Sequence, residues 1–222
     1  MTDMSPELRE EIESVLIAAF GDLRLIDEAD EPNVVGSFPL LHDGEIIDRF
    51  RIKISFPDAY PFEPPIVREV GQRIPHVPDR HNSNGVACLF VPIEWKMKRP
   101  DLRFRTFMTG PVHNYFLSQR YFEIHKEWPF GERDHGVFGE VEAACDLVGV
   151  ALERWNDLFS MLIKADPRGH WKCPCGSGER LRNCHIKKIL ALREHATADW
   201  AQKKIDQLRE HAEERRKLKT AA

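Results

Sequence analysis

The segment from Ile46 to Phe56, with the sequence IIDRFRIKISF, constrains the fold of this chain most strongly. From Phe50 onward, phenylalanine and isoleucine alternate with arginine, lysine and serine. Alternation of this kind puts all the apolar side chains on one face of a β-strand, so that one face is buried and the other is exposed. The segment therefore predicts a strand in a sheet whose apolar face is covered by another layer.

Three further segments are rich in β-branched and apolar residues: LRLID, NVVGSFPLL and IVREV. The turn-forming stretches EADEP and HDGE separate the first strands, which favours an antiparallel meander of four strands. Before them, Ser5 and Pro6 are typical of a helix start, and apolar residues recur at helical spacing until Gly21. The sequence thus predicts an α+β fold that begins with one helix.

The second half of the chain is expected to be mainly helical. We expect a long ordered loop over 71–105, a helix in VHNYFLSQRYFEIH, a glycine-rich loop in WPFGERDHGVFGE and one helix with an apolar stripe from Val141 to Leu162. Cys145 lies in that stripe, so it is expected to pack in the core. Residues 166–169 read as a linker, and a charged helical tail ends the chain.

Composition narrows the class of protein. The chain has 222 residues, 42% of them hydrophobic, and a formal net charge of -4, which fits a soluble protein better than one that coats nucleic acid. No segment approaches the ~20 apolar residues of a membrane span, and the acidic N-terminus does not resemble a secretory signal. Five cysteines, an odd number, favour reduced cytoplasm over a disulfide framework. We therefore expect a cytoplasmic protein that binds no membrane, with nucleic-acid binding disfavoured.

The segment CPCGSGERLRNCH contains a set of metal-ligating residues. Cys173, Cys175, Cys184 and His185 offer three thiolates and one imidazole, the donors of a closed tetrahedral zinc site with a structural role. Gly176 and Gly178 would allow the backbone to turn tightly around the ion. The motif resembles the short zinc-binding (SEC-C type) segment at the C-terminus of the SecA translocation ATPase. In that family the module contacts protein partners.

Two motifs around Cys88 resemble the ubiquitin-conjugating enzyme family. FPDAYPFEPPIV is similar to the family's Tyr-Pro-Phe-x-Pro-Pro corner before the fourth strand, and NSNGVACL is similar to the stretch that carries its catalytic thiol. The resemblance covers roughly residues 5 to 95 and implies the UBC-like fold, with an N-terminal helix, a four-stranded antiparallel meander and C-terminal helices. It also implies that Cys88 accepts a ubiquitin-like protein as a thioester and passes it to an amine; a buried or vestigial thiol is the alternative.

The chain departs from the family beside the cysteine. Pro78, Asp79 and Arg80 stand where the family has a His-Pro-Asn tripeptide, whose asparagine stabilises the oxyanion. His81 is the candidate to replace it, as a donor to the oxyanion or as a group that favours the thiolate, or else it is a solvated turn histidine. Asn82 and Asn84 are expected to shape the turn.

After Cys88 the chain resembles a bacterial branch of this family that is encoded beside antiphage defence genes. On that resemblance the partners are an adenylating, ThiF-like activating enzyme and either a ubiquitin-like protein or the C-terminus of a defence nucleotidyltransferase. His135, in the glycine-rich segment, either approaches the active site or is part of an ordinary loop.

These expectations combine into one prediction. Residues 1–165 form a ubiquitin-conjugating-like domain, 166–190 a zinc-binding module and 191–222 a charged helical tail. The chain is a cysteine-dependent acyl transferase; the alternative is a catalytically inactive protein that binds or scaffolds a ubiquitin-like partner.

Overall fold

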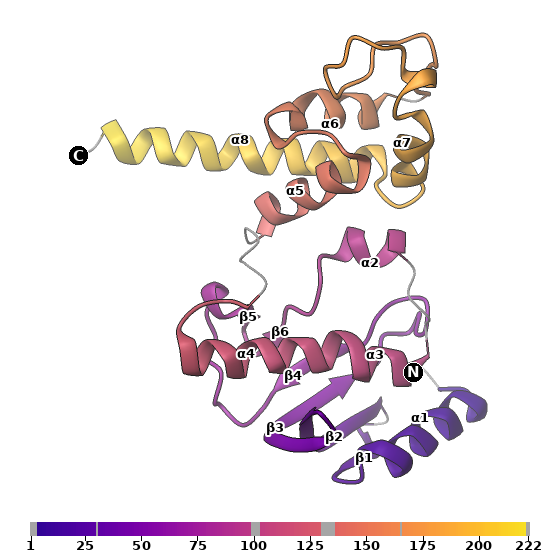
Figure 1. Ribbon diagram of the computed structural model, residues 1–222, viewed down its shortest axis with the longest axis vertical. Helices are drawn as coiled ribbons and strands as arrows, with labels where there is room; N and C mark the ends of the chain where they lie inside the picture. Colours follow the sequence, from indigo (N-terminus) through magenta and orange to yellow (C-terminus); the bar gives the residue numbers. More distant parts are fainter. Residues whose placement is uncertain (1–3, 30, 99–102, 130–135, 165, 221–222) are drawn as a thin grey trace. The chain divides into compact units, whose positions relative to one another are not determined.

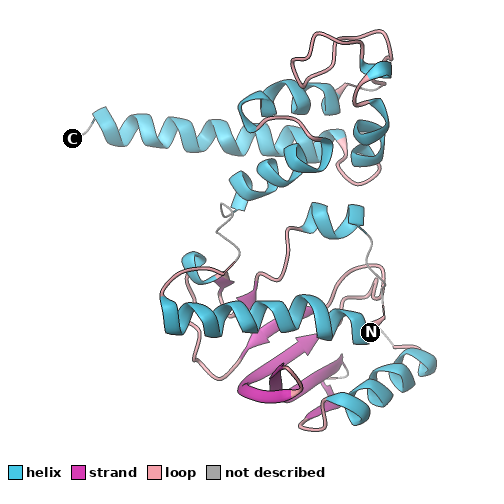
Figure 2. Ribbon diagram, in the orientation of Figure 1, coloured by secondary structure: helices cyan, strands magenta, loops and turns pink. Residues whose placement is uncertain are grey.

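The computed structural model describes residues 4–29, 31–98, 103–129, 136–164 and 166–220. The chain folds into two compact units, one made of Met1–Phe90 and Pro100–Glu132, the other of Val91–Arg99 and Arg133–Ala222. The first unit combines a sheet with helices, whereas the described part of the second unit is mainly helical (Figures 1 and 2). The predicted α+β class is confirmed.

Helix α1, Pro6–Ala19, opens the first unit. The Ser5 hydroxyl accepts a hydrogen bond from the backbone N–H of Leu8, and Pro6 occupies the first turn, where its missing N–H costs nothing. Ile12 and Leu16 are buried on one face of the helix. The helix start predicted from Ser5 and Pro6 is therefore confirmed.

The sheet has six strands in the order β1-β2-β3-β4-β6-β5. Its strands are β1 (Leu23–Glu28), β2 (Glu31–His42), β3 (Glu45–Ser55), β4 (Ile66–Glu69), β5 (Asn82–Ser83) and β6 (Val86–Ala87). All neighbouring pairs are antiparallel, so β1 to β4 form the predicted meander. In β3, Phe50, Ile52 and Ile54 are buried while Arg51 is exposed, as the alternation predicts.

A helical layer covers the apolar face of the sheet. Helix α3 (Phe104–Phe107) leads through a π-helical turn, Met108–Val112, into α4 (His113–His125), which crosses the sheet in Figure 1. Phe116 of α4 packs on the rings of Phe38 and Phe50, with centroid distances of 5.4 and 4.6 Å. These rings join α4 to β2 and β3, and α4 confirms the helix predicted in this part of the chain.

The predicted loop over 71–105 contains more structure than expected. It includes a 3-10 turn at Pro78–Arg80, strands β5 and β6, and α2, Pro92–Lys98. Each of these elements is too short to show a period in the sequence. The prediction of a single long loop is therefore wrong.

The second unit contains four further helices among the described residues. They are α5 (Gly136–Val148), α6 (Trp155–Ile163), α7 (Ile186–Arg193) and α8 (Ala198–Thr220). The single helix predicted from Val141 to Leu162 is in fact two, because the chain turns at Gly149, where φ is +84°. The glycine-rich loop also ends earlier than predicted, since α5 already begins at Gly136.

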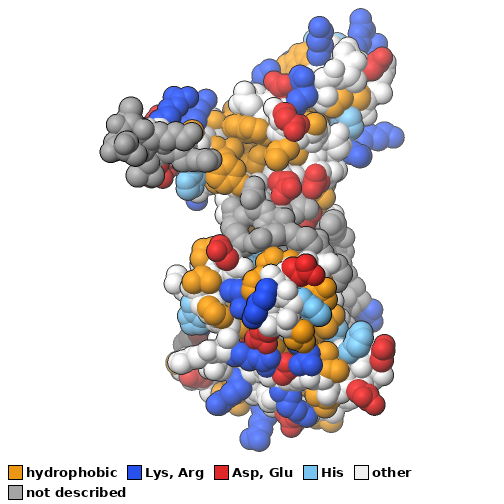
Figure 3. Space-filling view, turned by 60° about the vertical axis from the view of Figure 1, so that its left-hand side comes forward, with side chains coloured by type: hydrophobic (Ala, Val, Ile, Leu, Met, Phe, Trp, Pro, Cys, Tyr) orange, Lys and Arg blue, Asp and Glu red, His pale blue; other side chains and the backbone are white. Residues whose placement is uncertain are grey.

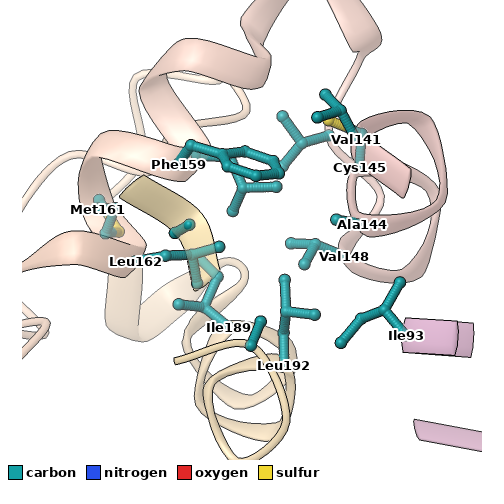
Figure 4. Close-up of a cluster of buried hydrophobic side chains, with 14 of the residues drawn as sticks. Ile93, Val141, Ala144, Cys145, Val148, Phe159, Met161, Leu162, Ile189 and Leu192 are labelled. Atoms are coloured by element: carbon teal, nitrogen blue, oxygen red, sulfur yellow. The ribbon is translucent and has the colours of Figure 1, made fainter. Parts of the chain in front are cut away.

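The apolar stripe still forms one core, because both helices point their apolar residues into it (Figure 4). Val141, Val148 and Leu162 are buried together with Ile189 of α7 and Ile93 of α2. Cys145 is 1% exposed in this cluster, which confirms its predicted role in packing. Helices α5 and α6 therefore share a core with the cysteine-rich segment, and the compact units do not follow the predicted boundaries at 165 and 190.

The predicted tail is partly a core element. Ala201 and Ile205 of α8 are buried, and Trp200 stacks on Phe159 at 5.5 Å between ring centroids. Lys204 is paired with Glu140 of α5 at 2.9 Å, with only 10% of the lysine side chain exposed. Only the later, charged turns of α8 behave as the predicted solvated helix. Within the described residues, no helix has both the length and the apolar character needed to cross a membrane.

Candidate functional site

Cys88 lies at the end of a tight hairpin in the first unit. Strands β5 and β6 are joined by Asn84 and Gly85, which have φ values of +51° and +80°. Positive φ at both central residues is typical of the type I′ turn, whose twist suits a two-residue hairpin. The backbone N–H of Cys88 donates to the carbonyl of His81 at 2.8 Å and closes the hairpin. The thiol is exposed.

The side chain of Asn82 fixes the same hairpin to the preceding part of the chain. Its side chain is 1% exposed, and its amide nitrogen donates to the carbonyl of Ile74 at 3.1 Å. Asn84 is exposed and supplies the left-handed backbone of the turn. The prediction that both asparagines shape the turn is therefore confirmed, through a buried hydrogen bond for one and backbone geometry for the other.

His81 and Cys88 line one cavity of about 240 Å³. Its other wall is formed by residues of α4 and of the segment that follows α4, namely Asn114, Tyr115, Ser118, Gln119, Trp128 and Pro129. Leu89 completes the lining. The structure thus brings the predicted nucleophile and its predicted helper to the same hollow.

Aromatic packing holds the histidine in place. The ring of His81 meets Trp128 edge-on at 4.7 Å, and Trp128 packs on Phe122 of α4 at 4.6 Å. The guanidinium of Arg80 lies 4.6 Å from the centre of the Phe122 ring. His81 is half-buried rather than fully solvated, and its imidazole ring lines the cavity.

The metal-ligand candidates meet in the second unit. One ligand atom from each of Cys173, Cys175, Cys184 and His185 lies within 4.8 Å of all the others. The sulfurs of Cys175 and Cys184 are 3.6 Å apart, and Nδ1 of His185 lies 3.2 Å from the sulfurs of both Cys173 and Cys184. The four residues can therefore bind a metal ion together.

A small hairpin creates this cluster. Lys172 and Arg180 form an antiparallel bridge, and the N–H of Cys173 donates to the carbonyl of Glu179 at 2.9 Å. Gly176 turns the chain with φ of +82°, and a Cβ there would lie 2.7 Å from the Arg154 guanidinium. The left-handed backbone therefore favours glycine at this position, as predicted for a chain that turns tightly around the candidate site.

The geometry fits a tetrahedral site. Metal–sulfur bonds of ~2.3 Å at tetrahedral angles separate two sulfurs by ~3.8 Å, close to the observed distance. Burial raises the pKa of Cys173. Burial also acts to raise the pKa of Cys175, but the Ser177 hydroxyl and the neighbouring backbone outweigh it and lower that pKa. Partly buried thiols packed against one another need a cation to stabilise their thiolates.

Sequence reasoning found the loop side of the cavity but not its helical wall. Asn114, Tyr115 and Ser118 carry no motif, and the buried polar Gln119 interrupts the apolar stripe that would have fixed the register of α4. Trp128 follows α4 in the segment WPF, whose tryptophan is the one available signal. His135, also a candidate, lies outside the described residues.

Comparisons with known proteins do not identify the chain, since no family, no curated protein and no solved structure matches it. The fold and the two clusters of side chains are therefore the basis for any statement about function.

Proposed function

We propose that this protein is a ubiquitin-conjugating-like enzyme that carries a ubiquitin-like protein as a thioester on Cys88. The observation that carries the proposal is the exposed thiol at the end of a tight hairpin, beside a cavity that His81 also lines. The order of α1 followed by four antiparallel strands agrees with the fold that the sequence resemblance implies. The Tyr60-Pro61 peptide lies in the proline-rich corner that carries the same resemblance.

The chemistry has two steps. In the first, the Cys88 thiolate attacks the thioester carbonyl of a loaded, ThiF-like activating enzyme; a tetrahedral oxyanion forms and collapses, expelling the donor cysteine as a thiolate. In the second, an amine attacks the new thioester, loses a proton and expels the Cys88 thiolate. The first step needs an accessible thiolate and the second an accessible thioester at the same sulfur, and a position at the end of a hairpin supplies that access. His81 is the proposed helper, as a donor to the oxyanion or as a group that favours the thiolate.

The four-residue cluster has a different proposed role. We assign it to Zn²⁺, because three thiolates and one imidazole fill the tetrahedral coordination that this ion prefers. No ligand position remains for a substrate, so the ion stabilises the second unit and takes no part in the transfer. A cytoplasmic protein acting in antiphage defence, with a ubiquitin-like protein or a nucleotidyltransferase C-terminus as cargo, is the setting that the bacterial resemblance suggests.

One observation favours a second candidate, a non-catalytic binding or scaffold protein. Pro78, Asp79 and Arg80 form a short 3-10 turn where the family has its asparagine, and the nearby Asn82 amide is buried and bonded to Ile74. Neither offers a free carboxamide to an oxyanion. A scaffold protein would use the cavity only as part of a surface that binds its ubiquitin-like partner.

Reconstitution of the transfer reaction distinguishes the transferase from the scaffold protein. The protein is incubated with an adenylating, ThiF-like activating enzyme, ATP and the ubiquitin-like protein, and adducts are resolved with and without thiol reductant. We expect a reductant-sensitive adduct that Cys88→Ala abolishes and that Cys145→Ala, which changes a buried cysteine, retains. An adduct that survives Cys88→Ala, or no adduct with an activating enzyme that charges itself, would refute catalysis at Cys88, and the second of these results would support the scaffold.

A further inference from the structure

The cavity beside Cys88 contains a buried hydroxyl group that lacks a hydrogen-bond partner. Tyr115 of α4 is 6% exposed, and its hydroxyl oxygen makes no hydrogen bond to any described residue. Leaving a buried hydroxyl unpaired costs free energy, so most buried hydroxyls have a hydrogen-bond partner in the working protein. The phenol therefore raises the question of which acceptor it meets in the working protein.

The nearest amide cannot supply that acceptor. The carbonyl oxygen of Gln119 accepts from both Nε and Nη2 of Arg80, at 3.2 and 2.8 Å, which uses its two lone pairs. The amide nitrogen of Gln119 donates to the carbonyl of Arg80 at 2.7 Å. Gln119 thus fixes the turn that leads to His81, and the phenolic proton still lacks an acceptor.

The charged groups around the phenol come from three elements. Burial is the main reason that the pKa of Tyr115 is raised, and a charge on Cys88 raises it further. Arg80 and the Gln119 side chain act in the opposite direction, and Glu69 of β4 acts in the same direction as Cys88. The Glu69 carboxylate already accepts hydrogen bonds from the backbone N–H groups of Gly71, Arg73 and Ile74. Cys88 is the nucleophile among the groups that act on this phenol.

We propose that the Tyr115 hydroxyl donates a hydrogen bond to the Cys88 thiolate and so stabilises the reactive form of the nucleophile. The inference rests on the proposed function, because it adds a residue to the same site. Because burial raises the pKa of Tyr115, the phenol is protonated at neutral pH and can act as a donor. A thiolate accepts a hydrogen bond much more strongly than a neutral thiol does, so a bond from this hydroxyl favours the thiolate form of Cys88.

Alkylation of Cys88 by iodoacetamide tests this without any activating enzyme. The thiolate attacks the methylene carbon and iodide leaves, so the rate follows the thiolate fraction. The rate is measured from pH 5 to 10 by mass spectrometry of the peptide that contains Cys88, for the full-length protein and two variants. Tyr115→Phe removes the proposed donor. Tyr60→Phe is the matched control, because Tyr60 also has a buried hydroxyl without a partner but lines a different cavity.

We expect the pH of half-maximal alkylation to rise by about one in Tyr115→Phe, as loss of a hydrogen bond to a charged group predicts, and to stay unchanged in Tyr60→Phe. The alkylation rate near neutral pH then falls about tenfold. The variant should unfold at the same denaturant concentration as the wild type or a higher one, since it removes an unpaired polar group.

Three results would overturn the proposal: identical pH profiles for Tyr115→Phe and the wild type, equal shifts in both variants, or a clear loss of stability in Tyr115→Phe, which would reveal another partner for the hydroxyl. The proposed function fails on a separate result. If the alkylation profile of Tyr115→Phe is shifted but reconstitution yields no thioester, the hydrogen bond to Cys88 stands and the proposed transferase activity is rejected.

Discussion

Asp48 of β3 is a carboxylate that pairs with two arginines. It accepts two hydrogen bonds from Arg73 at 2.8 Å, one from Arg120 at 2.8 Å and one from the N–H of Arg49 at 2.8 Å. Arg73 in turn lies over the Phe50 ring. The hydrogen bonds from Arg73, followed by those from Arg120 and Arg49, hold the pKa of Asp48 well below its usual range. This network joins β3 to the segment after β4 and to α4.

A depressed carboxylate pKa makes stability depend on pH in a defined direction. The contribution of Asp48 is complete above the unfolded pKa of ~3.9 and is lost as pH falls toward the lower folded value. We expect Asp48→Asn to be less stable than the wild type at pH 7, with a difference that shrinks below about pH 4. Urea unfolding at a series of pH values measures this. Asp43→Asn is the control, because Asp43 is 92% exposed and its ion pair with His42 spans 3.6 Å. A difference that grows in acid would contradict the assignment.

At the scale of single elements, the hairpin of β5 and β6 determines where the thiol lies. Gly85 has φ of +80°, and a Cβ there would lie 3.3 Å from the His76 ring. An alanine in left-handed backbone costs ~1–2 kcal/mol. We therefore expect Gly85→Ala to lower the free energy of unfolding by at least ~1 kcal/mol and to slow reaction at Cys88.

The matched control is Gly21→Ala, where a Cβ would meet nothing within 4 Å. Denaturant unfolding and the alkylation rate of Cys88 compare the two variants. Equal stability of both would show that the turn at Gly85 is not required for the hairpin.

The elements that sequence patterns predicted are those whose signals are local. The alternation in β3 and the cap at Ser5 depend on neighbouring residues, so β1 to β4 and α1 could be predicted correctly. Helix α2 and the strands β5 and β6 were missed because they are short. The apolar stripe from Val141 to Leu162 continues across the break at Gly149, because both helices face the same core, so the pattern predicted one helix instead of two.

The two candidate sites differ in the same way. The candidate metal ligands all lie in the short segment 173–185, so their spacing alone predicted that they would meet. The cavity beside Cys88 combines a loop with Tyr115 and Ser118 of α4, which are far along the chain from the thiol. Their meeting depends on how α4 packs on the sheet, and no local pattern encodes it.

At the scale of the whole molecule, the chain leaves the first unit at Phe90, contributes α2 to the second unit, and then returns. Ile93 of α2 is buried in the core that also contains Cys173, Leu181 and Ile189. The surface charge of the first unit is mixed. On the face that Figure 3 shows, Lys and Arg side chains lie among Asp and Glu side chains, which agrees with the small formal net charge of -4 for the whole chain.

Because the metal-site hairpin belongs to this core, removing the ion should loosen the whole second unit. We expect a chelator to reduce the hydrogen-exchange protection of residues 171–185 and of α5, α6 and α7, while β2 and β3 keep theirs. Cys184→Ser should have the same effect without a chelator. Unchanged protection after the metal has been removed, or an equal loss in both units, would contradict the structural role of the site.

The central claim is that Cys88 forms a covalent ester bond with the transferred protein, and Cys88→Ser tests it most directly. An oxygen nucleophile in place of sulfur converts a labile thioester into an oxyester. In reconstitution with the activating enzyme, ATP and the ubiquitin-like protein, we predict a wild-type adduct that reductant cleaves. For Cys88→Ser we predict an adduct that resists reductant and is cleaved by hydroxide. A Cys88→Ser adduct that reductant still cleaves would place the bond on another cysteine and contradict the account.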